Sequence, residues 1–78
     1  MNTLSEQLAV LRRRRGFSQS ELAKLAGISE RQVSRYENGG ADVMSTGTFS
    51  ALLYYLAETP DEKDALIGAL AELRNIPW

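Results

Sequence analysis

The 78-residue chain contains no cysteine and no histidine. Without cysteine it can form neither a disulfide nor a thiolate metal site. Without histidine it lacks the side chain that most often serves as a general base near neutral pH and as a metal ligand. The remaining reactive groups are carboxylates, lysines and hydroxyls scattered along the chain. We therefore expect no bound metal, no cofactor and no enzymatic activity.

Long apolar segments are also missing. No apolar run approaches the roughly 18 residues that span a membrane as a helix, and the first residues lack the charged-then-apolar order of a signal peptide. We expect no membrane partner and a cytoplasmic protein. Residues 1–78 are short enough for one small domain, which usually gains from tight helix packing or from a partner subunit.

Charge is unevenly distributed along the chain, although the net charge is only −1. Residues 1–40 hold seven basic and four acidic residues, a net charge of +3, whereas residues 41–78 hold two basic and six acidic residues, a net charge of −4. A polyanion such as DNA would be attracted to the first half of the chain. The acidic half is expected to face away from that polyanion or to meet another protein.

Apolar residues recur at helical spacing throughout, and no segment alternates as a strand does. The sequence therefore predicts an all-α domain of five helices. The first opens with a capping box of Thr3 and Glu6 and ends at Gly16. The fourth is capped by Ser45 or Thr46, and the fifth begins at Pro60 after Thr59. The second and third cover about Gln19–Ala26 and Glu30–Asn38.

Residues 18–39, SQSELAKLAGISERQVSRYENG, are the most informative segment. Two capping-box patterns follow one another here, formed by the pairs Ser18 with Glu21 and Ser29 with Gln32. Between them Gly27 stands where a helix must end, and Leu22, Leu25 and Ala26 give the preceding helix an apolar stripe. Two short helices joined by a tight turn form a helix-turn-helix, whose second helix lies in the DNA major groove.

This segment resembles the DNA-binding domain of the phage Cro/C1-type repressor family, also called the XRE family. The resemblance covers roughly residues 8–56. It is carried by matches at the family's spacing: Leu11-Arg12, Gly16-Phe17-Ser18-Gln19, Glu21-Leu22-Ala23, Ala26-Gly27, Ser29, Val33-Ser34 and Tyr36-Glu37-Asn38-Gly39. It implies a five-helix lambda-repressor-like domain with the helix-turn-helix as helices 2 and 3. The implied function is transcription regulation, by a repressor that binds a palindromic operator in double-stranded DNA as a homodimer.

The second helix of the motif divides into two faces when its residues are spaced about 100° apart. Val33, Tyr36 and Glu37 fall on the inner face. The outer face, which we place against base edges, holds Glu30, Arg31, Ser34 and Arg35. Arg31 and Arg35 are the main candidates for base contacts, because the planar guanidinium can donate two hydrogen bonds to the O6 and N7 atoms of one guanine.

Three other residues of this helix each have two interpretations. Glu30 either accepts a hydrogen bond from a cytosine amino group or only interacts with the helix dipole. Gln32 either contacts a base or phosphate or completes the capping box with Ser29. Ser34 either lies close to the groove floor or a thymine methyl group, or serves as a neutral spacer.

Six side chains are candidates for contacts with DNA phosphates: Arg13, Ser18, Gln19, Asn38, Ser45 and Thr46. The resemblance implies this role for Gln19 and Asn38, whose alternatives are a helix-start residue and a stop signal with Gly39. Residues 39–44 lack the basic residues that the family often carries there, so main-chain N–H groups or Ser45, Thr46 and Thr48 would have to supply contacts instead. Arg13 is included as the DNA-attracting part of a solvated helix end formed by Arg13–Arg15.

Arg12 differs from the other arginines in this run, because its spacing places it on the inner face with Leu8 and Leu11. The resemblance implies that an arginine at this position pairs with the glutamate at the end of the recognition helix, which is Glu37 here. We interpret that ion pair as structural.

A protein-interaction module is the alternative function, since the same fold serves in antitoxins that block a toxin. Tyr54, Tyr55 and the tail of Ile76, Pro77 and Trp78 are candidates for such a surface, although aromatic residues at helical spacing are more often core. The C-terminal helix and tail, residues 59–78, are also the segment that we expect to form the dimer.

Overall fold

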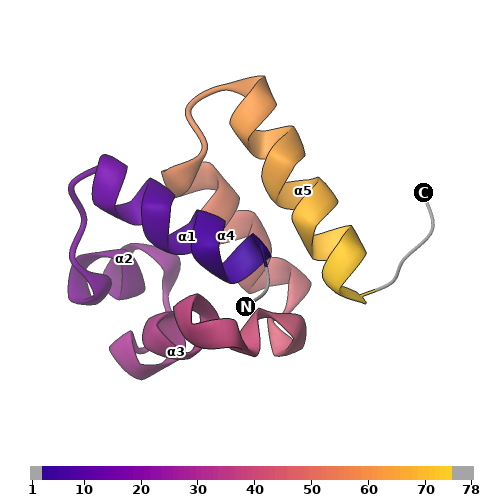
Figure 1. The fold of residues 1–78 in the computed structure, drawn as a ribbon. Helices are drawn as coiled ribbons and strands as arrows, with labels where there is room; N and C mark the ends of the chain where they lie inside the picture. Colours follow the sequence, from indigo (N-terminus) through magenta and orange to yellow (C-terminus); the bar gives the residue numbers. More distant parts are fainter. Residues whose placement is uncertain (1–2, 75–78) are drawn as a thin grey trace.

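Residues 3–74 are described by the computed structural model, except for the side chain of Thr3, and they contain five α-helices and no strand. Figure 1 shows their order: α1 (Thr3–Arg14), α2 (Gln19–Ala26), α3 (Glu30–Arg35), α4 (Thr46–Leu56) and α5 (Pro60–Arg74). Two short helical turns, η1 (Tyr36–Gly40) and η2 (Ala41–Val43), connect α3 to α4. The predicted all-α fold with a helix-turn-helix as its second and third helices is confirmed.

Two sequence predictions fall at the ends of the chain. Thr3 is the first residue of α1 rather than the residue before it, and its predicted capping box with Glu6 lies outside the described side chains. The predicted dimer tail of Ile76, Pro77 and Trp78 also lies outside the described residues.

Local capping signals fix where the later helices begin. Ser45 Oγ accepts the N–H of Thr48 at 3.1 Å, so Ser45 rather than Thr46 caps α4. Thr59 Oγ1 accepts the N–H of Glu62 at 3.1 Å, immediately before Pro60 opens α5. These bonds satisfy N–H groups that have no partner within the first turn of a helix. The helix starts therefore lie where the hydroxyl residues of the sequence place them.

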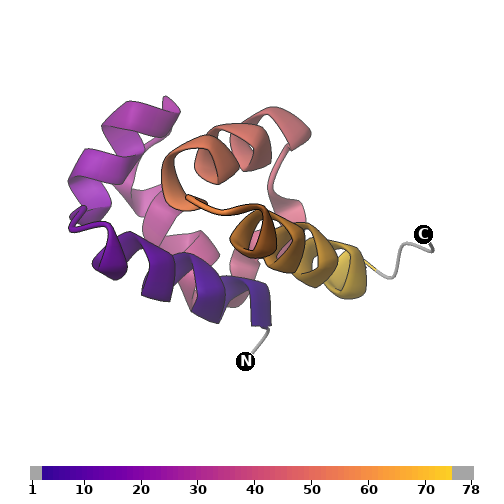
Figure 2. The ribbon, with the colours of Figure 1, turned by 90° about the horizontal axis from the view of Figure 1, so that it is seen from above.

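The core collects apolar side chains from all five α-helices and from the segment between α3 and α4. Its most deeply buried members are Leu4, Leu8, Leu22, Met44, Leu56 and Leu66. Figures 1 and 2 show α5 packed along α1 and lying on the opposite side of the molecule from α2. The acidic helix α5 is thereby separated in space from the helix-turn-helix.

One predicted core residue is exposed. Leu25 was grouped with Leu22 and Ala26 in an apolar stripe, but 41% of its surface is accessible. Leu22 and Ala23 are buried instead, and Ala26 is half-buried. At about 100° per residue these three side chains centre on one direction, and Leu25 lies roughly 100° away from it. A helix of only two turns buries a single narrow face.

Arg15 is not part of a solvated helix end, which corrects the prediction made for Arg13–Arg15 at this residue. The Arg15 side chain is only 11% exposed, and its Nη2 lies 2.5 Å from Glu62 Oε1. Its Nε donates to the carbonyl oxygen of Leu56 at 3.0 Å. Arg14 is exposed but forms a second ion pair with Glu62 at 3.3 Å. These contacts fasten the end of α1 to the connection between α4 and α5.

Glu62, in the first turn of α5, is the acidic centre of these contacts. Its carboxylate accepts the backbone N–H of Glu58 at 2.9 Å as well as the hydrogen bond from Arg15. The Glu58 N–H and then the Arg15 guanidinium lower the pKa of Glu62 below its ordinary value of 4.5. A carboxylate with a lowered pKa stabilises the fold in its charged form.

We expect Glu62→Gln to weaken the pH dependence of stability. Because the pKa of Glu62 is lowered in the folded state, its contribution is fully present above its unfolded value of 4.5 and is lost as the pH falls through the folded value. Thermal melts recorded between about pH 7 and about pH 3 should show a lower melting temperature for the variant at neutral pH and a smaller fall on acidification. The exposed Glu72 of the same helix provides the control Glu72→Gln, which should melt as the native protein does. A Glu62→Gln curve parallel to the native curve would contradict the assignment.

Candidate nucleic-acid interface

The turn between α2 and α3 is built from a glycine and a capped serine. Gly27 has φ +72°, a left-handed conformation that ends α2 and that residues with a Cβ rarely adopt. Ser29 then caps α3, because its Oγ accepts the N–H of Gln32 at 3.1 Å. α2 packs directly against α3 across this turn. The two helices are therefore held at a fixed angle by local sequence and by shared core contacts.

Exposure in α3 follows the predicted division into two faces. Val33 and Tyr36 are buried in the core, and the Glu37 side chain is only 6% exposed. The opposite face is open to solvent and consists of Glu30, Arg31, Gln32 and Arg35, with Ser34 half-buried beside them. The structure thus brings the predicted base-contacting residues together on one short exposed surface, which we call the α3 outer face.

Gln32 completes the capping box with Ser29. Its Oε1 accepts the backbone N–H of Ser29 at 3.0 Å and lies 3.3 Å from the Ser29 hydroxyl. Of the two interpretations given for Gln32, the structural one is therefore present. The capping box uses only the side-chain oxygen of Gln32. Contact between the side-chain nitrogen of Gln32 and DNA therefore stays a prediction.

The ion pair between Arg12 and Glu37 is present and joins α1 to η1, the helical turn that directly follows α3. Arg12 Nε lies 2.6 Å from Glu37 Oε2, and Arg12 Nη2 lies 3.2 Å from Glu37 Oε1. Arg12 Nη1 also donates to the carbonyl oxygen of Phe17 at 2.9 Å. With side-chain exposures of 13% and 6%, the two charges are largely withdrawn from solvent. Such a pair is directional, so it fixes the position of Glu37 relative to α1.

Gln19 belongs to the same cluster. Its Nε2 donates to Glu37 Oε1 at 3.1 Å, which gives the side chain a partner within the protein. A side-chain amide nitrogen carries two N–H groups, so one remains beside the backbone N–H groups at the start of α2. Contact between Gln19 and a phosphate stays a prediction. Such a contact would leave the hydrogen bond from Gln19 to Glu37 intact.

Asn38 acts as a helix stop in the structure. Its Nδ2 donates to the carbonyl oxygen of Ser34 at 2.7 Å, and its φ of −108° leaves the helical range. Gly39 follows with φ +106°, the left-handed conformation of a helix C-terminus. This is the alternative role given to Asn38 above, and the side chain remains exposed. Contact with a phosphate is untested by this geometry.

Ser5 is a site residue that sequence analysis did not identify. It is 3% exposed, and its Oγ donates to the carbonyl oxygen of Tyr36 at 2.5 Å. The same Oγ accepts the N–H of Gly39 at 3.1 Å. Ser5 therefore satisfies backbone groups at the end of the α3 segment. Its spacing of seven residues from Arg12, on the same face of α1, was a signal that both face α3.

The remaining phosphate candidates are all exposed: Arg13, Ser18, Ser45 and Thr46. Ser18 and Ser45 already serve as helix caps, so their hydroxyls lie beside the N–H groups of a first turn. Thr46 is the first residue of α4. These positions are suited to an anion. Residues 39–44 contain no basic residue that could assist them.

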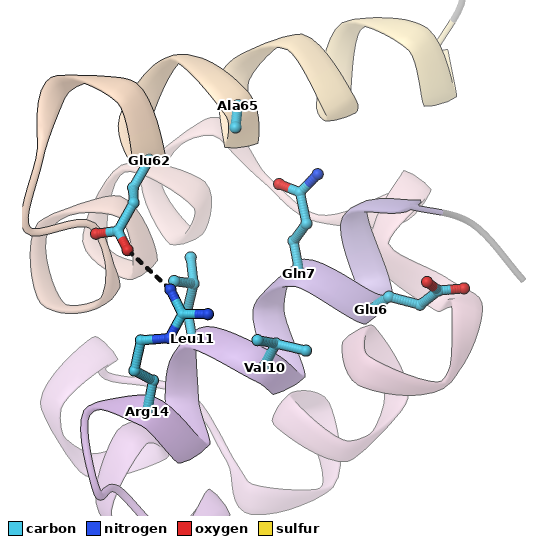
Figure 3. Close-up of a pocket in the computed structure, with 7 residues that line it drawn as sticks. All are labelled: Glu6, Gln7, Val10, Leu11, Arg14, Glu62 and Ala65. Atoms are coloured by element: carbon cyan, nitrogen blue, oxygen red, sulfur yellow. Dashed lines mark hydrogen bonds and ion pairs between the residues drawn. The ribbon is translucent and has the colours of Figure 1, made fainter.

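A groove between α1 and α5 lies on another side of the domain. Figure 3 shows its lining, which is Glu6, Gln7, Val10, Leu11, Arg14, Glu62 and Ala65, around about 300 Å³. Val10, one of these lining residues, is 44% exposed. Within residues 3–74 no acidic cluster is arranged to hold a metal ion. None of the helices in that range has both the length and the apolar character to cross a membrane.

Comparison with known families agrees with the geometry of α2 and α3. A family model described as a helix-turn-helix domain matches residues 3–66, from the start of α1 into α5. No curated protein and no solved structure matches the chain.

We expect Glu37→Ala to destabilise the fold by about 3 kcal/mol, because it leaves the largely buried guanidinium of Arg12 without its counter-charge. Urea unfolding at neutral pH measures this loss. Glu30→Ala is the matched control on the exposed side of the same helix and should cost less than about 1 kcal/mol. Equal unfolding midpoints for Glu37→Ala and the native protein would mean that the pair does not support the fold.

Proposed function

The chain belongs to the helix-turn-helix domain family, and we propose that it is a transcriptional regulator of the Cro/C1 (XRE) type that represses by occupying a palindromic operator as a homodimer. The observation that carries this proposal is the α3 outer face. Arg31 and Arg35 stand exposed on it, while the other side of the helix is fixed by the core and by the Arg12–Glu37 ion pair. Occupying an operator would exclude RNA polymerase from the promoter.

The spacing of the two arginines suits the DNA major groove. Four residues of α-helix advance about 6 Å, and successive base pairs are about 3.4 Å apart. Arg31 and Arg35 would therefore meet base pairs about two steps apart when α3 lies along the groove. Each can donate two hydrogen bonds to one guanine, a pairing that discriminates between bases by about 1–3 kcal/mol. Glu30, Gln32 and Ser34 would add contacts from the same surface.

Phosphate contacts in this proposal come from helix starts and one arginine. Ser18 and Gln19 flank the first N–H groups of α2, and Ser45 and Thr46 those of α4. Asn38 lies at the end of the recognition segment. Arg13 remains exposed, whereas Arg14 and Arg15 are engaged with Glu62. These contacts would set the orientation of α3 on the duplex.

Protein interaction, as in an antitoxin, is the second candidate function because an aromatic side chain stands in solvent. Tyr54 is 80% exposed on α4, and its ring meets that of Tyr55 edge to face with centroids 5.0 Å apart. Tyr55 is half-buried against the core. A toxin gene in the same operon would favour this function, and a divergent promoter with an inverted repeat would favour the repressor.

We expect Arg35→Ala to weaken binding to the specific duplex by about 1–3 kcal/mol and to relax base preference at one base pair. The duplex is first selected from random double-stranded DNA with the native protein and then varied one base pair at a time. Thermal stability should change little, because Arg35 is exposed. Arg13→Ala is the matched control, since it should lower the affinity for all duplexes alike and reduce the salt dependence. Failure to select any duplex would reject the DNA-reading function.

We propose that residues 1–78 act as one domain, with residues 59–78 forming the dimer seam. One recognition helix contacts too few base pairs to discriminate within a genome, and a two-fold dimer places two such helices about 34 Å apart on one face of DNA. Sedimentation should show a dimer, at least on the operator. A monomer that binds one half-site without cooperativity would contradict the dimer, and a dimer that survives truncation after Arg74 would exclude the tail as its seam.

A further inference from the structure

Two consecutive glycines follow Asn38, and the structure requires them for different reasons. Gly39 has φ +106°, which residues with a Cβ rarely adopt. Gly40 has φ −95° and ψ 20°, a negative-φ conformation of the bridge region that does not require glycine. Backbone strain therefore does not explain Gly40. The space around its Cα does, because that space is taken by the side chain of Arg35.

Arg35 lies directly against Gly40. A Cβ atom on Gly40 would stand 2.8 Å from Arg35 Cγ and 3.2 Å from Arg35 Nε. Carbon atoms in contact are normally about 3.5–4.0 Å apart, so this position cannot be filled while Arg35 keeps its rotamer. The carbonyl oxygen of Arg35 would be 3.1 Å away, which a shift of a few tenths of an ångström relieves. The side chain of Arg35 is therefore the principal obstacle.

The helix end explains why these two residues meet. The left-handed Gly39 is the first residue beyond the α3 segment. At a helix C-terminus of this type, the residues at the positions of Arg35 and Gly40 commonly make an apolar contact with each other. Here one of them is an arginine and the other has no side chain. The aliphatic part of the Arg35 side chain occupies the space that a side chain on residue 40 would take. Arg35 can point in this direction because residue 40 has no side chain.

We propose that Gly40 is a specificity-determining residue of this protein: by lacking a side chain it leaves room for Arg35 to lie along the end of α3, in the position from which the guanidinium would read a guanine. The inference rests on the proposed function, in which Arg35 contacts a base. Gly40 itself needs no contact with DNA. It acts through Arg35, and any larger residue at position 40 would redirect the guanidinium.

Small displacements of Arg35 matter because base readout is geometrically strict. A functional group must be held within about 0.5 Å and 10–20° of its productive geometry. A change of rotamer at the base of an arginine side chain moves its guanidinium by several times that distance. The expected result is loss of one bidentate pairing, which corresponds to about tenfold to one-hundredfold in discrimination at one base pair.

The test is a double-mutant cycle on the selected duplex, with Gly40→Ala, Arg35→Ala and the double variant. Gly40→Ala should lose about tenfold to one-hundredfold in discrimination at the same base pair as Arg35→Ala, and should add no loss in the Arg35→Ala background. Gly68→Ala is the matched control, because a Cβ at Gly68 meets nothing within 4 Å and lies in α5. A loss at a different base pair, or one that persists without Arg35, would overturn the proposal.

A readout without DNA separates this proposal from the proposed function. Three-bond NMR couplings of Arg35 should show one χ1 rotamer in the native protein and another in Gly40→Ala. If no duplex is selected but this rotamer changes, the DNA-reading function fails while control of Arg35 by Gly40 stands. If the rotamer is unchanged, the proposal fails whatever the protein binds.

The cycle also covers a Gly40→Ala variant that does not fold. In that case the double variant decides the cause, because Arg35→Ala removes the Cγ and Nε atoms and leaves the carbonyl oxygen in place. Recovery of folding in the double variant would support the side-chain contact. Failure to recover would assign the obstruction to the Arg35 carbonyl oxygen and overturn the proposal.

Discussion

The paired charges of Arg12 and Glu37 set the rotation of α3 about its own axis. This helix has only six residues, too few to be stable by itself. Val33 in α3 and Tyr36 at the start of η1 are buried in the core, but apolar burial is not directional. The bidentate pair to α1 is directional, and it determines which residues of α3 face outward. Contacts inside the domain therefore determine which surface of α3 is exposed to a ligand.

Withdrawing two charges from water is costly unless their hydrogen-bonding capacity is used. Here the Phe17 carbonyl and the Gln19 amide complete the pair, and Ser5 secures the same helix end through Tyr36. Across residues 3–74, every buried side-chain nitrogen or oxygen has a hydrogen-bond partner. Apolar residues could hold α3 with comparable stability, so the value of this network lies in the geometry that it specifies.

Features that depend on neighbouring residues could be predicted from the sequence. The caps at Ser18 and Ser29 and the turn at Gly27 each act within four residues, and all three lie where the sequence placed them. The link from Arg15 to Glu62 spans 47 residues, and spacing along one helix does not reveal what another helix brings to it. The Arg12–Glu37 pair spans 25 residues, and only resemblance to a family indicated it.

The run of four arginines illustrates how the fold redistributes charge that looks uniform in sequence. Consecutive helical residues point about 100° apart, so the four side chains diverge around α1. Arg12 turns inward to Glu37, Arg14 and Arg15 reach Glu62, and the exposed Arg13 takes part in neither of these networks. Arg12 and Arg15 are thereby largely withdrawn from solvent, which leaves fewer cations to neutralise phosphates than the sequence indicates. The contribution of base contacts from α3 to the affinity for DNA would be correspondingly larger.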